Sequence, residues 1–295
     1  MSRRSAALAA VATAALALTA CAPQEEEGTD ASASGSSAPA SAEAEQCSPE
    51  TLETLEPDTL TIATDEPAFE PWVVNDDPES GEGFEAAVAY AVAEELGYGR
   101  EQVTWTRVPF NAAIQPGARP FDFDINQFSI TEERKQAVDF SSPYYTVSQA
   151  VITTAGSAAD GATSLADLQD LRIGAQVATT SLDALEEVID PTTEPVVFNT
   201  NDDAKLALQN GQVDAIVTDL PTAFFITAVE LEDGVIVGQL DTGDESGDQF
   251  GLLLEKDSPL TDCVSQAVDA LREDGTLADL EQQWLSDVAD APVLS

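Results

Sequence analysis

The sequence predicts an α/β protein of two lobes that are joined by two strands. Between residues 164 and 240, short apolar runs alternate with segments of helical spacing, which is typical of a parallel α/β unit. A second set of strand-like and helical segments fills residues 60–125. Two further β-prone runs, 147–153 and 250–254, are placed to connect the lobes. Ligands of open α/β sheets bind beyond the carboxyl ends of the strands, so a ligand site is expected in the cleft between the lobes.

Residues 1–20 have the pattern of an export signal. A basic Arg-Arg pair precedes residues 6–18, which are Ala, Val and Leu with one Thr, a run too short to span a membrane. The LTAC sequence that ends at Cys21 resembles the lipobox of bacterial lipoproteins. The resemblance implies cleavage before Cys21 and a diacylglycerol on its sulfur. An ordinary signal peptide with a chance cysteine is the alternative.

Residues 21–57 are expected to be the lipid anchor and a disordered tether. Residues 22–46 are mostly Ala, Ser, Glu, Gly and Pro with no large apolar side chain, so they cannot form a core. With Cys21 lipidated, Cys47 and Cys263 remain. An exported protein meets oxidising conditions, so we expect these two to form a disulfide, with two buried thiols as the alternative.

Lobe 1 is expected to begin with residues 58–152. A helix is predicted from Gly83 to Leu96 because its apolar residues recur at helical spacing, and Gly97 ends it. Thr131 is expected to cap a short helix. The other predicted elements are strands at 60–64, 103–108, 121–125 and 147–153 and a short helix at 110–114.

Lobe 2 is expected to span residues 153–248, and residues 249–295 are expected to return to lobe 1. Predicted strands of lobe 2 are 171–175, 195–198, 213–218 and 235–240. Its predicted helices are 164–171, a segment from Thr180 or Ser181 to Asp190, 201–210 with Asn201 as cap, and one with Pro221 in its first turn. The returning segment is predicted to hold a strand at 250–254 and helices at 260–273 and 277–285.

Composition narrows the classes of partner. The chain has 11 Lys+Arg against 55 Asp+Glu, for a formal charge of −44, so nucleic acid and anionic lipid surfaces are poor partners. It has no histidine, which removes the commonest general base and metal ligand. The cysteines are far apart and form no metal-binding motif. We therefore expect no metal and no cofactor.

The segment from Ser129 to Arg134 (SITEER) is a candidate anion site. If Thr131 caps a helix, the N–H groups after it are free to bind a carboxylate. The planar fork of Arg134 matches a carboxylate with two parallel hydrogen bonds. A surface arginine paired with Glu133 or Asp139 is an equally good interpretation of the spacing alone.

Other candidate residues lie at strand ends and in loops. Asp219 ends an apolar strand and could hold an ammonium group, although a helix cap before Pro221 is an equal alternative. Phe69, Trp72 and Phe110 lie next to prolines in loops after strands and could form the wall of a pocket. Packing in the core is the usual alternative for such rings.

Seven motifs in order resemble the family 3 solute-binding proteins, which are polar amino-acid receptors of ABC importers. They are LTIATD with a following Phe-Glu-Pro-Trp, GF at 83–84, FSITEER at 128–134, VDFSSPYY at 138–145, SLADLQDLRIGAQVATTS at 164–181, QNGQVDAIVTD at 209–219 and DGTLADLEQQW at 274–284. The resemblance covers residues 58–287 and implies a two-lobed periplasmic-binding-protein-like fold (type II). The leader, tether and Ala-rich composition are similar to an actinobacterial, lipid-anchored version.

The resemblance also implies roles for individual residues. Arg134 would take the ligand's α-carboxylate, helped by Thr180 and by backbone N–H groups near Ser129 and Thr179. The α-ammonium would go to Asp219, helped by Ser129 and by the Gln127 carbonyl. Phe69 and Phe110 would enclose the ligand's side chain, with Asp65 near its far end.

The chain departs from the family pattern in three places. Glu85 follows Gly-Phe where the family often has GFDxDL, so one acid is lengthened and another is lost. Ala178 stands where QGTT has glycine, which bears on how closely the backbone approaches a ligand. Asn126 and Gln127 replace small residues, and their amides could contact the ligand's side chain. These departures leave the identity of the amino acid open.

The predicted function is capture of a free amino acid, polar and glutamine-like, and its delivery to ABC permease subunits. The protein would be a monomer on the extracellular face of the cytoplasmic membrane and would catalyse nothing. The excess of acids is also compatible with a cationic ligand, whereas an acidic ligand would need Arg107. The alternatives are a cyclohexadienyl-dehydratase-like enzyme, with Asp65 or Glu66 as general acid, and a surface sensor.

Overall fold

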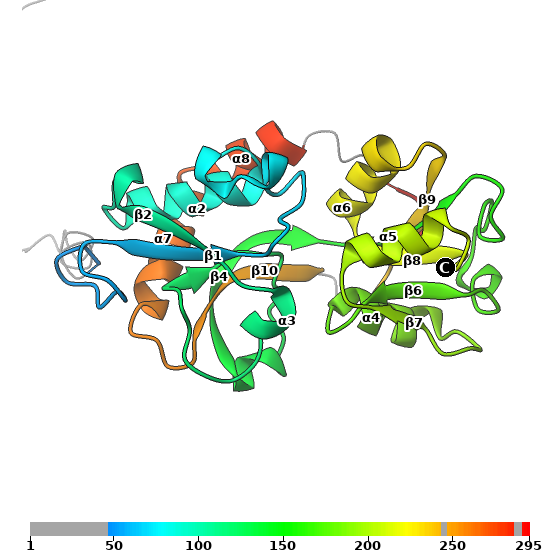
Figure 1. The fold of residues 1–295 in the computed structure, drawn as a ribbon, viewed down its shortest axis with the longest axis horizontal. Helices are drawn as coiled ribbons and strands as arrows, with labels where there is room; N and C mark the ends of the chain where they lie inside the picture. Colours follow the sequence, from blue (N-terminus) through cyan, green and yellow to red (C-terminus); the bar gives the residue numbers. More distant parts are fainter. Residues whose placement is uncertain (1–46, 243–246, 286–290) are drawn as a thin grey trace, which may run out of the picture. The chain divides into compact units, whose positions relative to one another are not determined.

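A computed structural model describes residues 47–242, 247–285 and 291–295. Within these residues the chain forms two lobes, each built on its own sheet (Figure 1). The sheet of lobe 1 has the strand order β2-β1-β3-β10-β4, and that of lobe 2 has the order β11-β9-β5-β8-β6-β7. The predicted signal peptide, Cys21 and the tether up to residue 46 lie outside the described residues.

Lobe 1 has three parallel strands next to two antiparallel ones. Apolar side chains of α2, α7 and α8 pack on one face of its sheet, and α3 packs on the other. The strands are β1 (Leu60–Thr64), β2 (Val103–Arg107), β3 (Phe123–Asp124), β4 (Val138–Val147) and β10 (Asp248–Glu255). The helices are α2 (Phe84–Glu95), α3 (Phe110–Ala113), α7 (Thr261–Glu273) and α8 (Thr276–Leu285), with short 3-10 turns η1 (Val74–Asp76), η2 (Pro78–Ser80), η3 (Arg100–Gln102) and η4 (Arg134–Gln136).

Helix α2 begins where the backbone requires glycine. Gly83 has φ 104°, and a Cβ there would clash with the carbonyl oxygen of Trp72. Helix α2 then packs Phe84, Val88 and Val92 into the core of lobe 1. The start of α2 is therefore held against the loop that follows β1.

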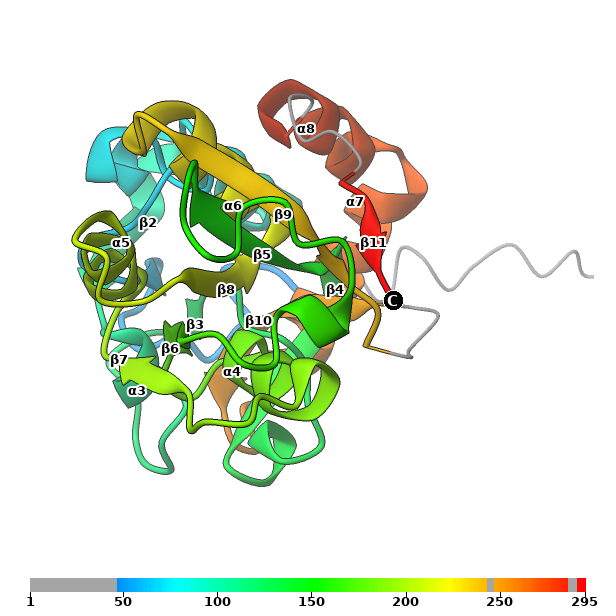
Figure 2. The ribbon, with the colours of Figure 1, turned by 90° about the vertical axis from the view of Figure 1, so that its right-hand side faces the viewer.

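Lobe 2 has helices on both faces of its sheet. Apolar residues of α5 and α6 pack on one face, and those of α4 and η6 on the other, as Figures 1 and 2 show. Its strands are β5 (Gln149–Thr154), β6 (Ile173–Gln176), β7 (Val196–Phe198), β8 (Ala215–Asp219), β9 (Gly234–Leu240) and β11 (Val293–Leu294). Its helical segments are η5 (Leu165–Asp167), α4 (Thr180–Ala184) with the π-turn η6 (Leu185–Ile189), α5 (Asn201–Gln209), and α6 (Leu220–Phe225) with the π-turn η7 (Ile226–Glu230).

The chain crosses between the lobes three times, the last time between α8 of lobe 1 and β11 of lobe 2. The first crossing is short, because β4 ends at Val147 and β5 begins at Gln149. The second runs through residues 241–247, which are only partly described. The strand predicted at 250–254 as a connection belongs to the sheet of lobe 1, where β10 pairs with β4.

The last residues correct the predicted domain boundaries. Residues 249–295 were all expected in lobe 1, but β11 pairs in parallel with β9 of lobe 2. The Gln239 N–H donates to the Pro292 carbonyl at 2.8 Å, so β11 covers the outer edge of β9. Unpaired backbone groups of an edge strand favour such an addition.

Residues 47–57 are part of the described fold, although they were predicted to belong to the tether. Cys47 and Cys263 are bonded as predicted, which ties the chain to α7. Leu52 packs against the core of lobe 1, and the Leu55 N–H donates to Asp122 at 2.8 Å. Residues 47–57 are therefore packed on lobe 1, and their assignment to the tether is wrong.

Other local differences reflect tertiary contacts. Strand β4 was not predicted, because its serines and Pro143 weaken the alternation, but β10 pairs with it across two irregularities. The helix expected after Thr131 is only the turn η4, in which the Arg134 N–H donates to Thr131 Oγ1 at 3.1 Å. Thr200, not Asn201, caps α5. Among the described residues, no helix is both long and apolar enough to cross a membrane.

Candidate functional site

A cavity lies between the lobes at the carboxyl ends of parallel strands from both sheets. Its empty space is about 440 Å³ when the open solvent at its mouth is included, and the part that the centre of a water molecule can reach is about 40 Å³. This is the position at which open α/β sheets bind ligands. Lobe 1 contributes Asp65, Phe69, Phe110, Asn126, Gln127, Ser129 and Arg134, and lobe 2 contributes Gln176, Thr179, Thr180, Ser181, Asn201 and Asp219.

Arg134 lies in the cavity and contacts both lobes. Its Nη1 donates to the Ser129 carbonyl at 2.7 Å, and its Nη2 donates to the Ala178 carbonyl at 2.8 Å. Its guanidinium carbon lies 5.5 Å from the centre of the Phe110 ring. Burial lowers the pKa of Arg134, although Asp183, Asp219 and other nearby acids raise it. A guanidinium has five N–H donors, and these two bonds among the described residues use two of them.

Asp219 faces the same cavity from the end of β8. Its Oδ1 accepts a hydrogen bond from Gln149 Nε2 at 2.8 Å, and none of the salt bridges seen among the described residues includes it. Burial raises the pKa of Asp219 to about 7, the Gln149 hydrogen bond opposes that shift, and the negative charges of Asp248 and Glu85 add to it. A positively charged ligand group would offset these charges.

Gln149 organises this end of the cavity, although it was not among the predicted site residues. It is fully buried at the start of β5. Its Nε2 donates to Asp248 at 2.9 Å as well as to Asp219, and its Oε1 accepts from Ser181 Oγ at 2.6 Å. A glutamine directly before the apolar run Ala150–Ile152 was the available signal.

Hydroxyl groups join the two sides of the cavity. Ser129 Oγ and Thr180 Oγ1 lie 3.0 Å apart across the lobes. The Thr179 hydroxyl donates to the Gln176 carbonyl at 2.7 Å and accepts from the Leu182 N–H at 3.2 Å, so it caps α4. Of the predicted helpers, Thr180 and Ser129 therefore meet directly, while the Thr179 hydroxyl is engaged within lobe 2.

Rings and an acid line the other part of the cavity. Phe69 and Phe110 both reach it, and Phe110 stacks on Phe128 with ring centres 4.9 Å apart. Burial raises the pKa of Asp65, which is opposed by the N–H groups of Glu66 and Phe110. This part of the cavity therefore combines aromatic walls with a carboxyl group.

Trp72 does not line the cavity, so its prediction as a pocket residue is wrong. It is 1 % exposed and meets Phe84, Tyr145 and Phe250 edge to face. Its Nε1 donates to Thr222 Oγ1 of lobe 2 at 2.9 Å. The ring packs in the core because its apolar area is covered there while its N–H finds a partner across the lobes.

Arg107, the candidate partner of an acidic ligand, is engaged elsewhere. It forms a salt bridge with Asp76 at 2.8 Å and donates to the Asp65 carbonyl oxygen. It is not among the residues that line the cavity. Among the described residues, no group of three or more His, Cys, Asp or Glu side chains is placed to hold a metal ion.

Comparisons with known proteins agree with this architecture. An L-arginine-binding protein of Pseudomonas aeruginosa is 27% identical over 247 residues, which are 77% of this chain and 90% of that protein. The glutamine-binding protein GlnH of an ABC transporter of Bacillus subtilis is 25% identical over 224 residues, 71% of this chain and 76% of its own length.

Solved structures show the same two-lobed fold. The structure of an ancestral arginine-binding protein bound to arginine matches with a TM-score of 0.63 at 30% identity, over 77% of this chain and 98% of that one. An ancestral amino-acid-binding protein described as a precursor of cyclohexadienyl dehydratase matches with a TM-score of 0.62 at 28% identity, over 77% and 95%. These matches confirm the predicted periplasmic-binding-protein-like fold.

The family model of the bacterial extracellular solute-binding proteins, family 3, matches residues 60–287. The matched segment includes both sheets up to β10 and every residue that lines the cavity. With the motifs, the fold and the cavity in agreement, the chain belongs to the family 3 solute-binding proteins.

Proposed function

We propose that this protein captures a free L-amino acid outside the cytoplasm and delivers it to the permease of an ABC importer. The observation that supports this most directly is the charge arrangement of the cavity. Arg134 from lobe 1 and Asp219 from lobe 2 line the same cavity. A zwitterion between them would offset both charges and touch both lobes.

The α-groups of the ligand would bind at these two residues. The guanidinium of Arg134 suits a carboxylate. The Thr180 hydroxyl is close to it, because Ser129 contacts Arg134 through its carbonyl and Thr180 through its hydroxyl. Asp219 would accept from the α-ammonium together with the Gln127 carbonyl. Burying both ends of a zwitterion costs several kcal/mol unless each is paired, so binding should be selective for α-amino acids.

The charge of the cavity favours a cationic side chain over a neutral one. After the ligand's α-groups have offset the charges of Arg134 and Asp219, the Asp65 carboxyl remains at the end of the cavity that the aromatic rings line. A guanidinium or ammonium there would offset it and could stack on Phe69 or Phe110. The arginine-binding relatives support this preference. A glutamine-like ligand, which the sequence analysis favoured, could use the Asn126 and Gln127 amides, and the ancestral arginine-binding protein was also solved with glutamine.

The contacts between the lobes suggest how binding is signalled. Arg134 to Ala178, Ser129 to Thr180 and Trp72 to Thr222 all join the two lobes. A ligand that bridges the same gap would favour the closed form over an open one. The closed form, held at the membrane through Cys21 and acting as a monomer, would then dock on the permease.

A thermal-shift panel of the twenty amino acids tests this function on wild type and Arg134→Ala. A ligand at 100 times its Kd adds about 2.7 kcal/mol of stability, or a few degrees for this size. We expect L-arginine and its cationic relatives to give the largest shifts and Arg134→Ala to abolish them. Arg172→Ala, which removes an arginine of lobe 2 that does not line the cavity, is the matched control and should keep the shifts.

Two other outcomes would change the assignment. No shift from any amino acid would leave the fold standing and remove the receptor function. Chemical conversion of a bound cyclic precursor of phenylalanine would favour the dehydratase instead, since a receptor returns its ligand unchanged.

A further inference from the structure

Glu85 is a buried acid close to the cavity but not part of its lining. It lies in the first turn of α2 and is 0% exposed. Packing alone does not explain it, because burying an unneeded carboxyl is costly compared with an apolar residue. No salt bridge seen among the described residues includes it.

Three hydrogen-bond donors from two other segments surround the Glu85 carboxylate. The backbone N–H of Gln127 donates to its Oε1 at 2.8 Å. The Gln127 side-chain amide donates to its Oε2, and the Tyr144 hydroxyl of β4 donates to its Oε1. An ionised carboxylate accepts all three bonds, whereas a neutral acid or amide would place a further donor among them.

Two of these bonds hold a residue of the cavity in an unusual backbone conformation. Gln127 has φ 47°, a left-handed value that costs a residue with a Cβ about 1 kcal/mol or more. Glu85 binds both the backbone N–H and the side chain of Gln127. Gln127 lines the cavity together with Asp219, so its backbone carbonyl is a candidate acceptor for a ligand there.

We propose that Glu85 is the positioning residue of the ammonium subsite: it holds Gln127 so that the carbonyl can accept from the ligand's α-ammonium beside Asp219. This inference rests on the proposed function, because it assigns the ammonium to Gln127 and Asp219. Glu85 would contribute to this subsite without touching the ligand. The negative charge of Glu85 also favours a cation at this end of the cavity, since Glu85 and Asp219 interact electrostatically.

The arrangement has a consequence for pH. Burial raises the pKa of Glu85 to about 7, and the hydrogen bonds from Tyr144 and Gln127 oppose that shift. The titratable groups that face it are Tyr144 of β4, Asp124 of β3 and Asp219 of β8. Below neutral pH a proton on Glu85 would disturb Gln127 while a proton on Asp219 would remove its charge. Affinity for an α-amino acid should therefore fall on acidification through two groups.

Titration calorimetry with two probes tests the inference on the full-length protein. The probes are L-arginine and 5-guanidinopentanoate, which is arginine without its α-amino group. We expect Glu85→Gln to weaken L-arginine binding by about tenfold or more, as for a lost charge-assisted bond, and to change binding of the analogue less than about twofold. Glu95→Gln, an exposed acid on the same helix, is the matched control and should change neither.

The pH profile gives a readout that a purely structural role would not change. Between pH 8 and 5, log Kd of the wild type for L-arginine should approach a slope of about two per pH unit, against about one in Glu85→Gln. Tyr144→Phe removes one hydrogen bond to ionised Glu85 and should move the midpoint of the pH dependence of Kd up by about half a pH unit. Tyr144→Phe keeps the test available if Glu85→Gln fails to fold, as judged by circular dichroism.

The possible failures are distinct. An equal loss of affinity for both probes in Glu85→Gln would overturn the role of Glu85 while leaving the receptor function intact. An unchanged affinity and an unchanged pH slope in the variants would do the same. A wild type that binds neither L-arginine nor L-glutamine would overturn the proposed function, and this inference with it.

Discussion

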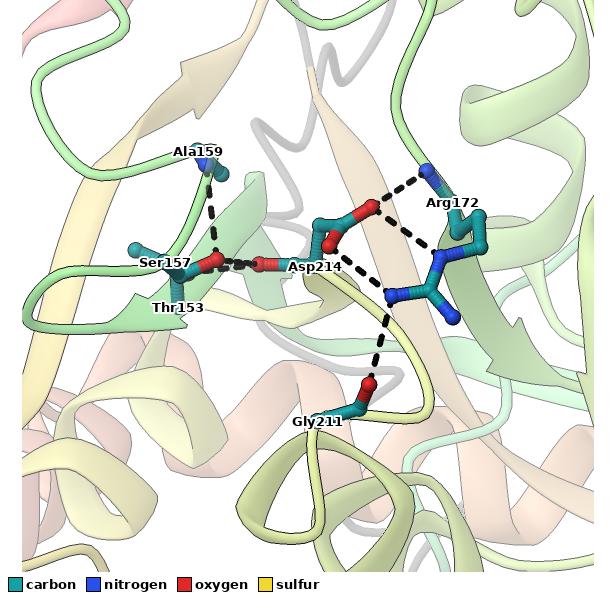
Figure 3. A network of polar contacts seen from close by, with 6 residues as sticks. All are labelled: Thr153, Ser157, Ala159, Arg172, Gly211 and Asp214. Atoms are coloured by element: carbon teal, nitrogen blue, oxygen red, sulfur yellow. Dashed lines mark hydrogen bonds and ion pairs between the residues drawn. The ribbon is translucent and has the colours of Figure 1, made fainter.

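Strand β8 has an aspartate at each end, and the surroundings of the two carboxyl groups are opposite. Asp214 directly precedes β8, and Figure 3 shows it within a network of polar contacts. Its carboxylate accepts from the Arg172 backbone N–H at 2.9 Å and from Arg172 Nη2 at 3.1 Å. Its carbonyl accepts from the hydroxyls of Thr153 and Ser157, both at 2.6 Å. Asp219, five residues on, faces the cavity, and its carboxylate accepts a hydrogen bond from the neutral amide of Gln149.

The difference appears in the pKa values. Burial alone would raise the pKa of Asp214, but the hydrogen bonds and charge of Arg172 bring it below its usual range. Burial raises the pKa of Asp219 to about 7. The fold provides the Asp214 carboxylate with hydrogen bonds and the charge of Arg172. Ionised Asp219 is destabilised by burial, and a bound cation would offset that free-energy cost. A carboxylate that the fold leaves without a cation is therefore the better candidate for binding.

The largest expected effect is on binding. Asp219→Asn should weaken the binding of L-arginine by about 100-fold or more, because a buried ammonium would lose its charged partner. Asp214→Asn at the other end of the strand should leave Kd within about twofold. Titration calorimetry of both variants measures the contrast, and similar losses in the two would mean that Asp219 contributes through the sheet instead of the ligand.

The next effect is on stability against pH, and the two ends should differ in sign. The raised pKa of Asp219 means that the native state holds a proton that the unfolded state releases above about pH 4. Its contribution to the free energy of unfolding is therefore largest at low pH and is lost as pH rises through 7. The pKa of Asp214 is lower in the folded protein than in the unfolded chain, so ionised Asp214 stabilises the fold at pH values above its unfolded pKa. This contribution to stability is lost on acidification.

Unfolding in urea at several pH values from 4 to 8 checks this sign. Asp219→Asn should gain stability over the wild type at pH 8 but not at pH 4. A variant with the same pH dependence as the wild type would show that the pKa of Asp219 is not raised in the folded protein.

A smaller effect is expected from breaking the Arg172 pair. Asp214→Asn should lower the free energy of unfolding by about 1 kcal/mol at pH 7, since the Arg172 side chain is 56% exposed and solvent screens the pair. Thermal melts should show a loss of a few degrees. Raising the salt concentration should shrink the difference from the wild type, and a difference that persists in 1 M salt would point to the backbone contacts of Asp214 instead.

The smallest effect is expected at the cavity end, from Ala178→Gly. Ala178 has φ 61°, and its carbonyl accepts from Arg134. Glycine adopts this conformation freely but loses more entropy on folding, so the two terms should nearly cancel, with a change of stability within about 0.5 kcal/mol. Melting temperatures of the variant and wild type measure it. A destabilisation above 1 kcal/mol would mean that the Ala178 methyl group is needed for packing.

The sequence by itself determined the fold class and the main helices, and it offered two charged residues as candidates for the site. Hydrophobic periodicity predicted α2 and α7, and an apolar run that ends in an acid predicted β8 and Asp219. These signals are local, because helical spacing and strand alternation repeat within a few residues. Arg134 and Asp219 became candidates from their places near segment ends, but spacing alone left a surface ion pair and a helix cap as equal alternatives, and the family resemblance favoured the site.

Only the tertiary structure decided which polar and aromatic side chains belong to the site. Phe69 and Trp72 lie in one loop, yet Phe69 lines the cavity and Trp72 packs in the core. Glu85 meets Gln127 across 42 residues of chain, and Gln149 meets Asp219 across 70. The pairing of β11 with β9 spans a similar distance. Burial and hydrogen-bond partners depend on such distant contacts, which no local pattern encodes, and these contacts determine which charged groups are left for a ligand.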